Sequence, residues 1–325
     1  MISRQELRRY FIKAEQARGD ALPTSLPTHH WRLQPALAAL HQALDTLADP
    51  TADSVRALVE AAFADTGWID GWIAAMAQDA LRDAYFEPPL APTGNGFQHG
   101  VAIFAHRHVN IALNSLPVDA LAAKKMQRRG PAAITFTGTV SVQKFLRAGG
   151  AVLRMWDAPQ VSGNFSLDDS PKCRPAGYRA LEDGEILTLD GRTQSYVIEH
   201  AIGDIVVLQA EILLDRAPLL VEYDSEDLTA VAACSTSDTA SRSQMLLSFL
   251  ASLGRSEDDA VVEPFTHDDS FFLRWHATTE LFRLNEGRAR ARLRTMAERD
   301  PHPDLRAAAR NALGMIEAEA GACHA

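Results

Sequence analysis

The hydrophobic pattern of this chain changes character twice. Residues 131–224 are rich in β-branched residues at the two-residue spacing of strands, whereas apolar residues on both sides recur at helical spacing. A strand presents alternate residues to one face, and a helix presents every third or fourth residue. The pattern therefore predicts an α+β chain, with a central β region between two helical regions.

Helical spacing on the N-terminal side predicts several helices. The clearest apolar stripe is formed by Val55, Leu58, Val59 and Ala62. The prolines and glycines of residues 87–96 end this region, because proline cannot donate a backbone hydrogen bond. The predicted helices cover residues 3–18, 34–48, 53–65 and 68–85.

Short strands separated by turn signals fill the central region. Asp183-Gly184 and Asp190-Gly191 are typical of tight hairpins, because glycine accepts a positive φ without a Cβ clash. Short strands without helices between them favour an antiparallel sandwich or a small barrel. The polar segment 158–176 is predicted to be a mobile lid or an ordered loop over one mouth. The predicted strands cover residues 132–137, 139–147, 151–157, 177–181, 185–190, 195–202, 204–213 and 218–223.

Two segments before the β region allow alternative interpretations. Residues 97–116 form either a strand, with Val101 and Ile111 on one face, or a helix with His108 in its apolar stripe. We prefer the strand because it leads into the β region. Residues 118–130 are predicted to be a short helix or a loop.

An internal repeat appears near the C-terminus. Residues 271–281 superpose on residues 303–313 at an offset of 32, which places Leu273 on Leu305 and Arg274 on Arg306. Another predicted helix lies between the two copies. A helix-pair unit that recurs at this period indicates an α-solenoid.

Charge and composition exclude some classes of partner. The formal charge of −10 opposes broad nucleic-acid binding, because a negative surface repels phosphate backbones. No apolar run approaches the roughly 20 residues that a membrane span needs. The three cysteines form no disulfide framework, so we expect a cytoplasmic protein. The expected regions are a helical region (1–92), a β-sandwich (93–235) and a helical repeat region (236–325).

Three histidines are candidate metal ligands. His106 and His108 form an HxH pair, and on a strand the two imidazoles would point the same way and hold one metal ion. The alternative is a polar, solvent-facing strand surface. His200 shares parity with Tyr196 and Ile198, which predicts that it points into the sandwich. It is then either a ligand in a barrel cavity or a core histidine with local hydrogen-bond partners.

Three further residues are candidates for binding a small ligand. Arg154 alternates with apolar residues on its strand, so its guanidinium needs a carboxylate partner or an anionic ligand. Gln209 and Glu211 share one face of another strand, where they are that partner or part of a cavity wall.

Two family resemblances follow from these segments. RARARLRTMAERDPHPDLRAAARNAL resembles a HEAT-type repeat, which implies a stacking or binding surface, with Asp300 or Asp304 and Arg306 in the stabilising positions. LEDGEILTLDG and GDIVVLQAE resemble a cupin-like double-stranded β-helix. The cupin resemblance implies a metal ion inside the barrel and, by analogy, a homodimer. The usual glutamate after the HxH pair is not present at a short distance.

Two hypotheses of function remain open. In the first, a cupin-like protein binds a small ligand or a divalent metal such as Fe, Mn, Zn or Ni inside the central barrel, and it is a metal-dependent enzyme if that metal is catalytic. Its site would contain His106, His108, His200, Arg154 and Glu211. In the second, a non-catalytic adaptor holds a protein partner with its helical repeats. No sequence motif fixes a reaction, so an enzymatic role stays undecided.

Overall fold

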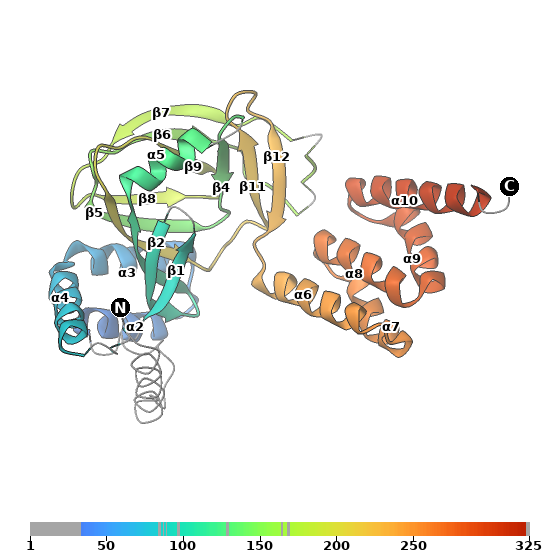
Figure 1. Cartoon of the computed structure of the whole chain (residues 1–325), viewed down its shortest axis with the longest axis horizontal. Helices are drawn as coiled ribbons and strands as arrows, with labels where there is room; N and C mark the ends of the chain where they lie inside the picture. The colour runs from blue at the N-terminus through green and yellow to red at the C-terminus, as the bar shows by residue number, and fades with distance from the viewer. Residues whose placement is uncertain are drawn as a thin grey trace, which may run out of the picture.

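The computed structural model describes residues 34–322, apart from residues 84, 85, 87, 89, 96, 97, 128, 129, 164, 168 and 169. The chain has an α+β fold, with the β region between N-terminal helices and a C-terminal group of helices (Figure 1). The helix that the sequence predicts over residues 3–18 lies outside the described residues. No helix in the described part of the chain is long and apolar enough to cross a membrane.

The strands form three antiparallel sheets and not a closed barrel. The described part of 97–116 forms two strands, as we preferred to a helix, and they fold back on each other as a hairpin. A last strand after residue 229 was not predicted. The six-stranded sheet has the order β1 (Ala91–Asn95), β2 (Gln98–His106), β3 (Val109–Leu116), β10 (Ile205–Ile212), β5 (Val140–Arg147), β8 (Ile186–Asp190). One smaller sheet has the order β12 (Ala230–Ser235), β11 (Leu219–Asp224), β4 (Ala133–Phe136), and the other β7 (Arg174–Ala180), β6 (Val152–Asp157), β9 (Gln194–His200).

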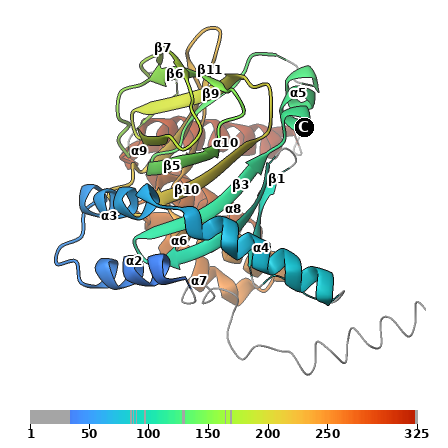
Figure 2. The ribbon, with the colours of Figure 1, turned by 90° about the vertical axis from the view of Figure 1, so that its left-hand side faces the viewer.

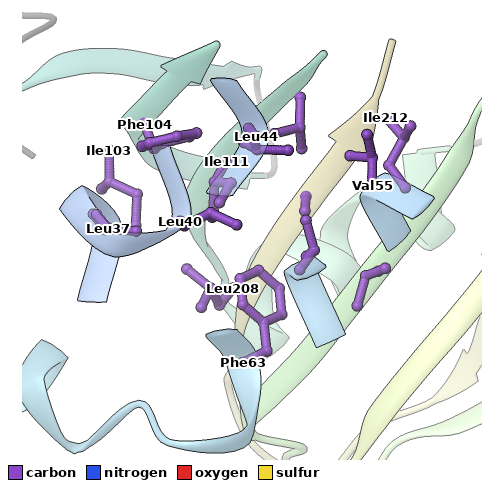
Figure 3. Packing of buried hydrophobic residues seen from close by; sticks show 14 of the residues in the cluster. Leu37, Leu40, Leu44, Val55, Phe63, Ile103, Phe104, Ile111, Leu208 and Ile212 are labelled. Atoms are coloured by element: carbon purple, nitrogen blue, oxygen red, sulfur yellow. The ribbon is translucent and has the colours of Figure 1, made fainter. Parts of the chain in front are cut away.

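The N-terminal helices cover the outer face of the six-stranded sheet (Figure 2). They are α2 (Pro35–Asp45), α3 (Ala52–Ala64) and α4 (Gly67–Arg82). Thr51 and Ser54 form a capping box that satisfies free N–H groups at the start of α3. Leu40 and Leu44 of α2 and Phe63 of α3 pack on Leu208 of β10 (Figure 3). This core fixes α2 to the sheet.

The other face of the six-stranded sheet looks towards the sheet of β6 and β9. Val207 of β10 and Phe145 of β5 pack there with Leu153 of β6 in a second core. A third core joins Trp156 of β6 to Tyr223 of β11. Successive side chains of β10 therefore pack alternately into two different cores, as the two-residue period of a strand requires. Between the strands, α5 (Val118–Gln127) forms the helix that was one of two alternatives for that segment.

The C-terminal helices repeat one hydrogen-bond arrangement. Arg274 Nη1 donates to the carbonyls of Asp268 and Asp269 at 2.8 and 2.9 Å. Thirty-two residues later, Arg306 Nη1 donates to the carbonyls of Asp300 and Pro301 at 2.6 and 3.2 Å. The two copies thus share backbone contacts as well as sequence. The helices are α6 (Asp238–Leu253), α7 (Asp259–Val262), α8 (Phe271–Leu284), α9 (Glu286–Arg299) and α10 (Pro303–Ala322).

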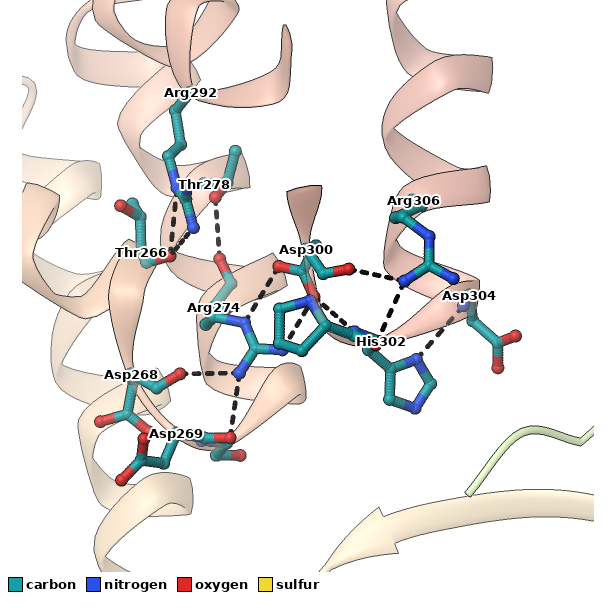
Figure 4. A network of polar contacts seen from close by, with 12 residues as sticks. Thr266, Asp268, Asp269, Arg274, Thr278, Arg292, Asp300, His302, Asp304 and Arg306 are labelled. Carbon is teal, nitrogen blue, oxygen red and sulfur yellow. Dashed lines mark hydrogen bonds and ion pairs between the residues drawn. The ribbon is translucent and has the colours of Figure 1, made fainter. Parts of the chain in front are cut away.

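A buried ion pair joins these repeats. The guanidinium of Arg274 donates to both carboxylate oxygens of Asp300, at 3.1 and 2.9 Å (Figure 4). Next to it, His302 is fully buried and its Nε2 lies 3.0 Å from the Phe165 carbonyl. Ser166 donates to Asp304 at 2.7 Å. Phe165 and Ser166 therefore attach this part of the loop between β6 and β7 to the helical tail.

Candidate functional site

A cluster of titratable side chains lies where α2 meets the hairpin of β2 and β3. His41 and Asp45 are four residues apart on α2, so they share one helix face. His106 is the last residue of β2, beside the turn that leads to β3. Each of the three side chains offers one metal-ligating atom, and these atoms all lie within 4.8 Å of one another.

The aspartate lies between the two imidazoles. His106 Nε2 is 3.2 Å from Asp45 Oδ1, and His41 Nδ1 is 3.1 Å from Asp45 Oδ2. The two rings are 5.2 Å apart at 82°. The His106 side chain is only 5% exposed, whereas that of Asp45 is 52% exposed. The cluster is therefore closed towards the sheet and open to solvent on the side of the carboxylate.

Hydrogen bonds lower the pKa of Asp45 and select the tautomer of His106. The hydrogen bond with His106 lowers the pKa of Asp45, and the nearby imidazoles and Arg107 lower it further. The backbone N–H of His108 donates to His106 Nδ1 at 3.2 Å. With Nδ1 accepting this bond, His106 Nε2 carries the proton that is donated to the Asp45 carboxylate.

The donor set fits a divalent transition metal ion. Imidazole nitrogens and a carboxylate oxygen bind such ions at about 2.0–2.2 Å, which separates tetrahedral ligands by about 3.4 Å. The separations of 3.1 Å from His41 Nδ1 to Asp45 Oδ2 and of 3.2 Å from His106 Nε2 to Asp45 Oδ1 are close to that spacing, and each involves a different oxygen of the carboxylate. A metal ion bound to His106 Nε2 would displace the proton there, and Nδ1 would carry the proton of the imidazole instead. Nδ1 could then no longer accept the 3.2 Å hydrogen bond from the His108 N–H. That bond contributes about 1 kcal/mol, far less than metal ligation.

The imidazoles of the predicted HxH pair lie next to each other, with ring centroids 4.9 Å apart at 62°. A turn follows His106, so the alternation of a single strand does not bring the two rings to one metal-binding cluster. His108 is buried and its Nε2 accepts from Arg107 Nε at 3.0 Å, while its Nδ1 has no hydrogen-bond partner. Burial lowers the pKa of His108, and the charges of His106 and Arg107 add to this. Among the described residues, only His106 of the pair joins the cluster.

The predicted interior position of His200 is wrong. His200 is exposed at the end of β9. The register between β9 and β6 shifts where Val152 faces His200 and Leu153 faces Ile198, so Glu199 is an extra residue in the ladder. Such a bulge reverses the alternation that follows it. Tyr196, Ile198 and then Ala201 pack on the core, and the imidazole points away from it.

The predicted ligand-binding residues have different surroundings. Arg154 lies over the ring of Trp156, with its guanidinium carbon 4.4 Å from the ring centroid. Gln209 accepts a hydrogen bond from Asn114 at 3.5 Å, and Glu211 is exposed on the same strand. The structure therefore gives Arg154 a cation–π contact, and the expectation of a carboxylate partner or an anionic ligand for this residue stays a prediction.

The inner face of the six-stranded sheet carries a short polar network near Gln209. Gln143 lies opposite Gln209 in the ladder of β5 and β10. It accepts from the Tyr196 hydroxyl at 2.6 Å and donates to Ser141 at 3.3 Å. Burial raises the pKa of Tyr196 to about 12, so this hydroxyl stays protonated and acts as a donor. Sequence alternation correctly placed Gln209 and Glu211 on one face of this strand.

Two of the three clustered residues were not predicted to be ligands. His41 and Asp45 lie at helical spacing in the segment HQALD, inside a helix that was predicted. That spacing was a usable signal for a shared face. Their proximity to His106, however, depends on the packing of α2 against the hairpin, which no local pattern encodes.

Comparisons with known proteins give a limited likeness. No protein-family model and no curated protein match the chain. Ectoine synthase from P. lautus is 8% identical over 37% of this chain and 67% of its own, with a TM-score of 0.23. The Schizosaccharomyces pombe Cnp3 cupin domain is 4% identical over 35% of this chain and 60% of its own, with a TM-score of 0.22. A Bordetella pertussis cupin domain is 13% identical over 38% and 92%, with a TM-score of 0.21. Each of these matches covers less than two fifths of this chain.

Proposed function

We propose that the protein binds one divalent transition metal ion through His41, Asp45 and His106. The observation that carries this proposal is the convergence of three ligand atoms, from two elements far apart in the sequence, within 4.8 Å. The site lies between α2 and the hairpin, outside the sandwich where the sequence had suggested a metal. It keeps one predicted ligand, His106, and replaces His108 and His200 with His41 and Asp45.

The structure of the site favours an ion with open coordination positions. Two nitrogens and one oxygen suit Zn²⁺, Fe²⁺, Mn²⁺ or Ni²⁺ rather than Ca²⁺, which prefers six or more oxygens. A bound ion of this kind supplies Lewis-acid chemistry to water or to a small ligand. The core residues Leu40 and Leu44 hold α2 on the sheet, so His41 and Asp45 are oriented before any ion arrives.

Titration of metal-free protein with Zn²⁺ and with Mn²⁺ by calorimetry tests this site. We expect one equivalent to bind, and His106→Gln or His41→Gln to weaken the affinity at least tenfold, because each removes one of three ligands. His200→Gln is the matched control, since His200 is exposed and outside the cluster. Equal affinities for the three variants, or no binding by the wild type, would contradict the proposal.

We propose as a second function that the helical tail binds a protein partner. One side of α6 carries Met245, Leu246, Phe249 and Leu253, which are 53%, 62%, 63% and 64% exposed. Their spacing of one, four and eight residues groups them on one helix face. Exposed apolar stripes of this kind bind amphipathic helices. The formal charge of −10 favours a partner helix with a basic rim.

A synthetic amphipathic helix with leucines on one face and lysines beside them is a suitable probe. Fluorescence anisotropy is expected to show binding that Phe249→Ser weakens about tenfold, in line with the loss of a central aromatic contact. Met315→Ser is the control, because Met315 is 68% exposed on another helix. Failure of the wild type to bind the peptide would contradict this function. A wild-type dimer in sedimentation that Phe249→Ser dissociates would instead assign the face to a second copy.

A further inference from the structure

A cleft of about 530 Å³ lies at the junction of the β region and the helical tail. Three connections form its walls: the link from β10 to β11, the link from β12 to α6, and the residues before α8. The volume falls in the range of about 300–1,000 Å³ that small-molecule sites occupy. A ligand in this cleft would contact both parts of the molecule at once. The cleft shares no residue with the metal site.

Arg216 supplies the positive charge of the cleft. Its side chain is 20% exposed, and Nη1 donates to the Thr236 carbonyl at 3.1 Å. The buried Nε has no hydrogen-bond partner, so the guanidinium has donor capacity left. Asp238 approaches Nη1 at 3.6 Å, which is longer than a hydrogen bond, and its side chain is 72% exposed. Because the Asp238 carboxylate is exposed and beyond hydrogen-bond distance, this pair is weak and an anionic ligand could replace it.

Backbone groups add to the positive potential. The first turns of α6 and α8 both line the cleft, through Asp238 and through Phe271 and Phe272. Ser270 at the start of α8 makes no side-chain capping bond to that turn. The N-terminal end of a helix carries a partial positive charge and unpaired N–H groups. These groups reinforce Arg216 as donors to a negative ligand.

Part of the remaining lining is apolar, alongside the polar residues Ser235, Thr236, Ser237, Thr239, Asp269 and Ser270. Leu213 and Leu219 come from the β region, and Phe271 and Phe272 come from α8. The two phenylalanine rings are 4.0 Å apart and stacked. Such walls remove apolar ligand surface from water and favour a flat ring on an aromatic edge or face. The cleft thus combines a cationic group with an aromatic wall.

We propose that this cleft binds an organic anion with an aromatic body. The anionic group takes the position opposite Arg216 and displaces the exposed carboxylate of Asp238. The ring packs against Phe272 and the edge of Phe271, because Phe271 is stacked on both Phe272 and His302. Asp238 and Asp269 also line the cleft and oppose an anion. Removing the competing charge of Asp238 should therefore strengthen binding, whereas removing the charge of Arg216 should weaken it.

Phenylacetate and phenyl phosphate are the probes, because they share a ring and differ in the anionic group. Calorimetry is expected to show binding of at least one, with no comparable binding of the uncharged 2-phenylethanol. Arg216→Gln should weaken the affinity about tenfold or more, because it removes a charged hydrogen-bond donor. Asp238→Asn should strengthen it severalfold. The preferred probe identifies the ligand as a carboxylate or a phosphate.

Two controls distinguish binding in this cleft from metal binding and from a loss of folding. His106→Gln removes a metal ligand and should leave phenylacetate binding unchanged. The metal-binding proposal and the anion-binding proposal are therefore tested independently. Circular dichroism of Arg216→Gln tests whether the variant folds, and Arg216→Lys provides a second variant that keeps the charge. Equal binding of the uncharged probe, weaker binding by Asp238→Asn, or no binding of either anion would overturn the proposal.

Discussion

Replacing Asp300 with alanine is expected to lower the free energy of unfolding of the helical tail by about 3–5 kcal/mol. The Asp300 side chain is fully buried, and that of Arg274 is 8% exposed. The carboxylate accepts two hydrogen bonds from Arg274 and one from the backbone N–H of His302. Alanine at this position leaves a buried guanidinium without its counter-charge, and that penalty exceeds the value of an exposed pair.

Denaturant unfolding followed by circular dichroism measures this loss. Glu298→Ala is the matched control, because Glu298 forms an exposed pair with Arg299 at 3.9 Å and should cost about 1 kcal/mol or less. The double variant Arg274→Met, Asp300→Leu should lose less than the sum of the two single changes, since it removes both charges together. A loss for Asp300→Ala no larger than that for Glu298→Ala would refute a structural role for the buried pair.

The same pair predicts a pH dependence. Burial alone would raise the pKa of Asp300, but hydrogen bonds from Arg274 and His302 and the charge of Arg274 hold it below its usual value of 3.8. A carboxyl with a lower pKa in the folded state adds stability above its unfolded pKa, and that stability is lost as pH falls through the folded value. The difference in stability between wild type and Asp300→Asn should therefore shrink below about pH 3.8.

Leu44→Ala is expected to destabilise the fold by about 2–5 kcal/mol and to weaken the metal site. Leu44 is fully buried in the core that joins α2 to the six-stranded sheet (Figure 3). Truncation leaves a cavity that the surrounding side chains fill only in part. Asp45 is the residue after Leu44 and the last residue of α2, so a shift of this helix displaces the carboxylate from His106.

Leu81→Ala provides the matched control for that change. Leu81 is 88% exposed on α4, so the same truncation should alter stability by less than about 0.5 kcal/mol. Thermal unfolding with and without Zn²⁺ measures both effects, because a ligand that binds only the folded state raises the midpoint. A similar loss for both leucine variants, or an unchanged Zn²⁺ effect in Leu44→Ala, would contradict the role given to α2.

The local periodicity of apolar residues was enough to predict most of the helices and strands. The stripe through Val55 and Val59 predicted a helix over 53–65, and α3 spans Ala52–Ala64 with both valines buried. Alternation in residues 204–213 predicted a strand, and β10 spans Ile205–Ile212. These predictions succeed because burial on one face imposes a fixed period on neighbouring residues. The α+β arrangement follows from the order of the segments.

The candidate site depended on features that periodicity cannot show. A bulge near Glu199 reversed the parity on which the position of His200 rested. A turn before β3 ended the strand alternation between His106 and His108, whose rings lie 4.9 Å apart but do not share the three-residue cluster. The approach of α2 to this turn then brought Asp45 to His106, which is 61 positions away in the sequence. Register shifts and tertiary packing therefore decided the site, and both lie outside a local pattern.

Elemental analysis of protein purified without chelators tests the metal site most directly. The arrangement of His41, Asp45 and His106 predicts one equivalent of a divalent transition metal per chain. His106→Gln should lose it, and His200→Gln should retain it. A chain that contains no metal, or a His106→Gln protein that still carries a full equivalent, would contradict the central claim.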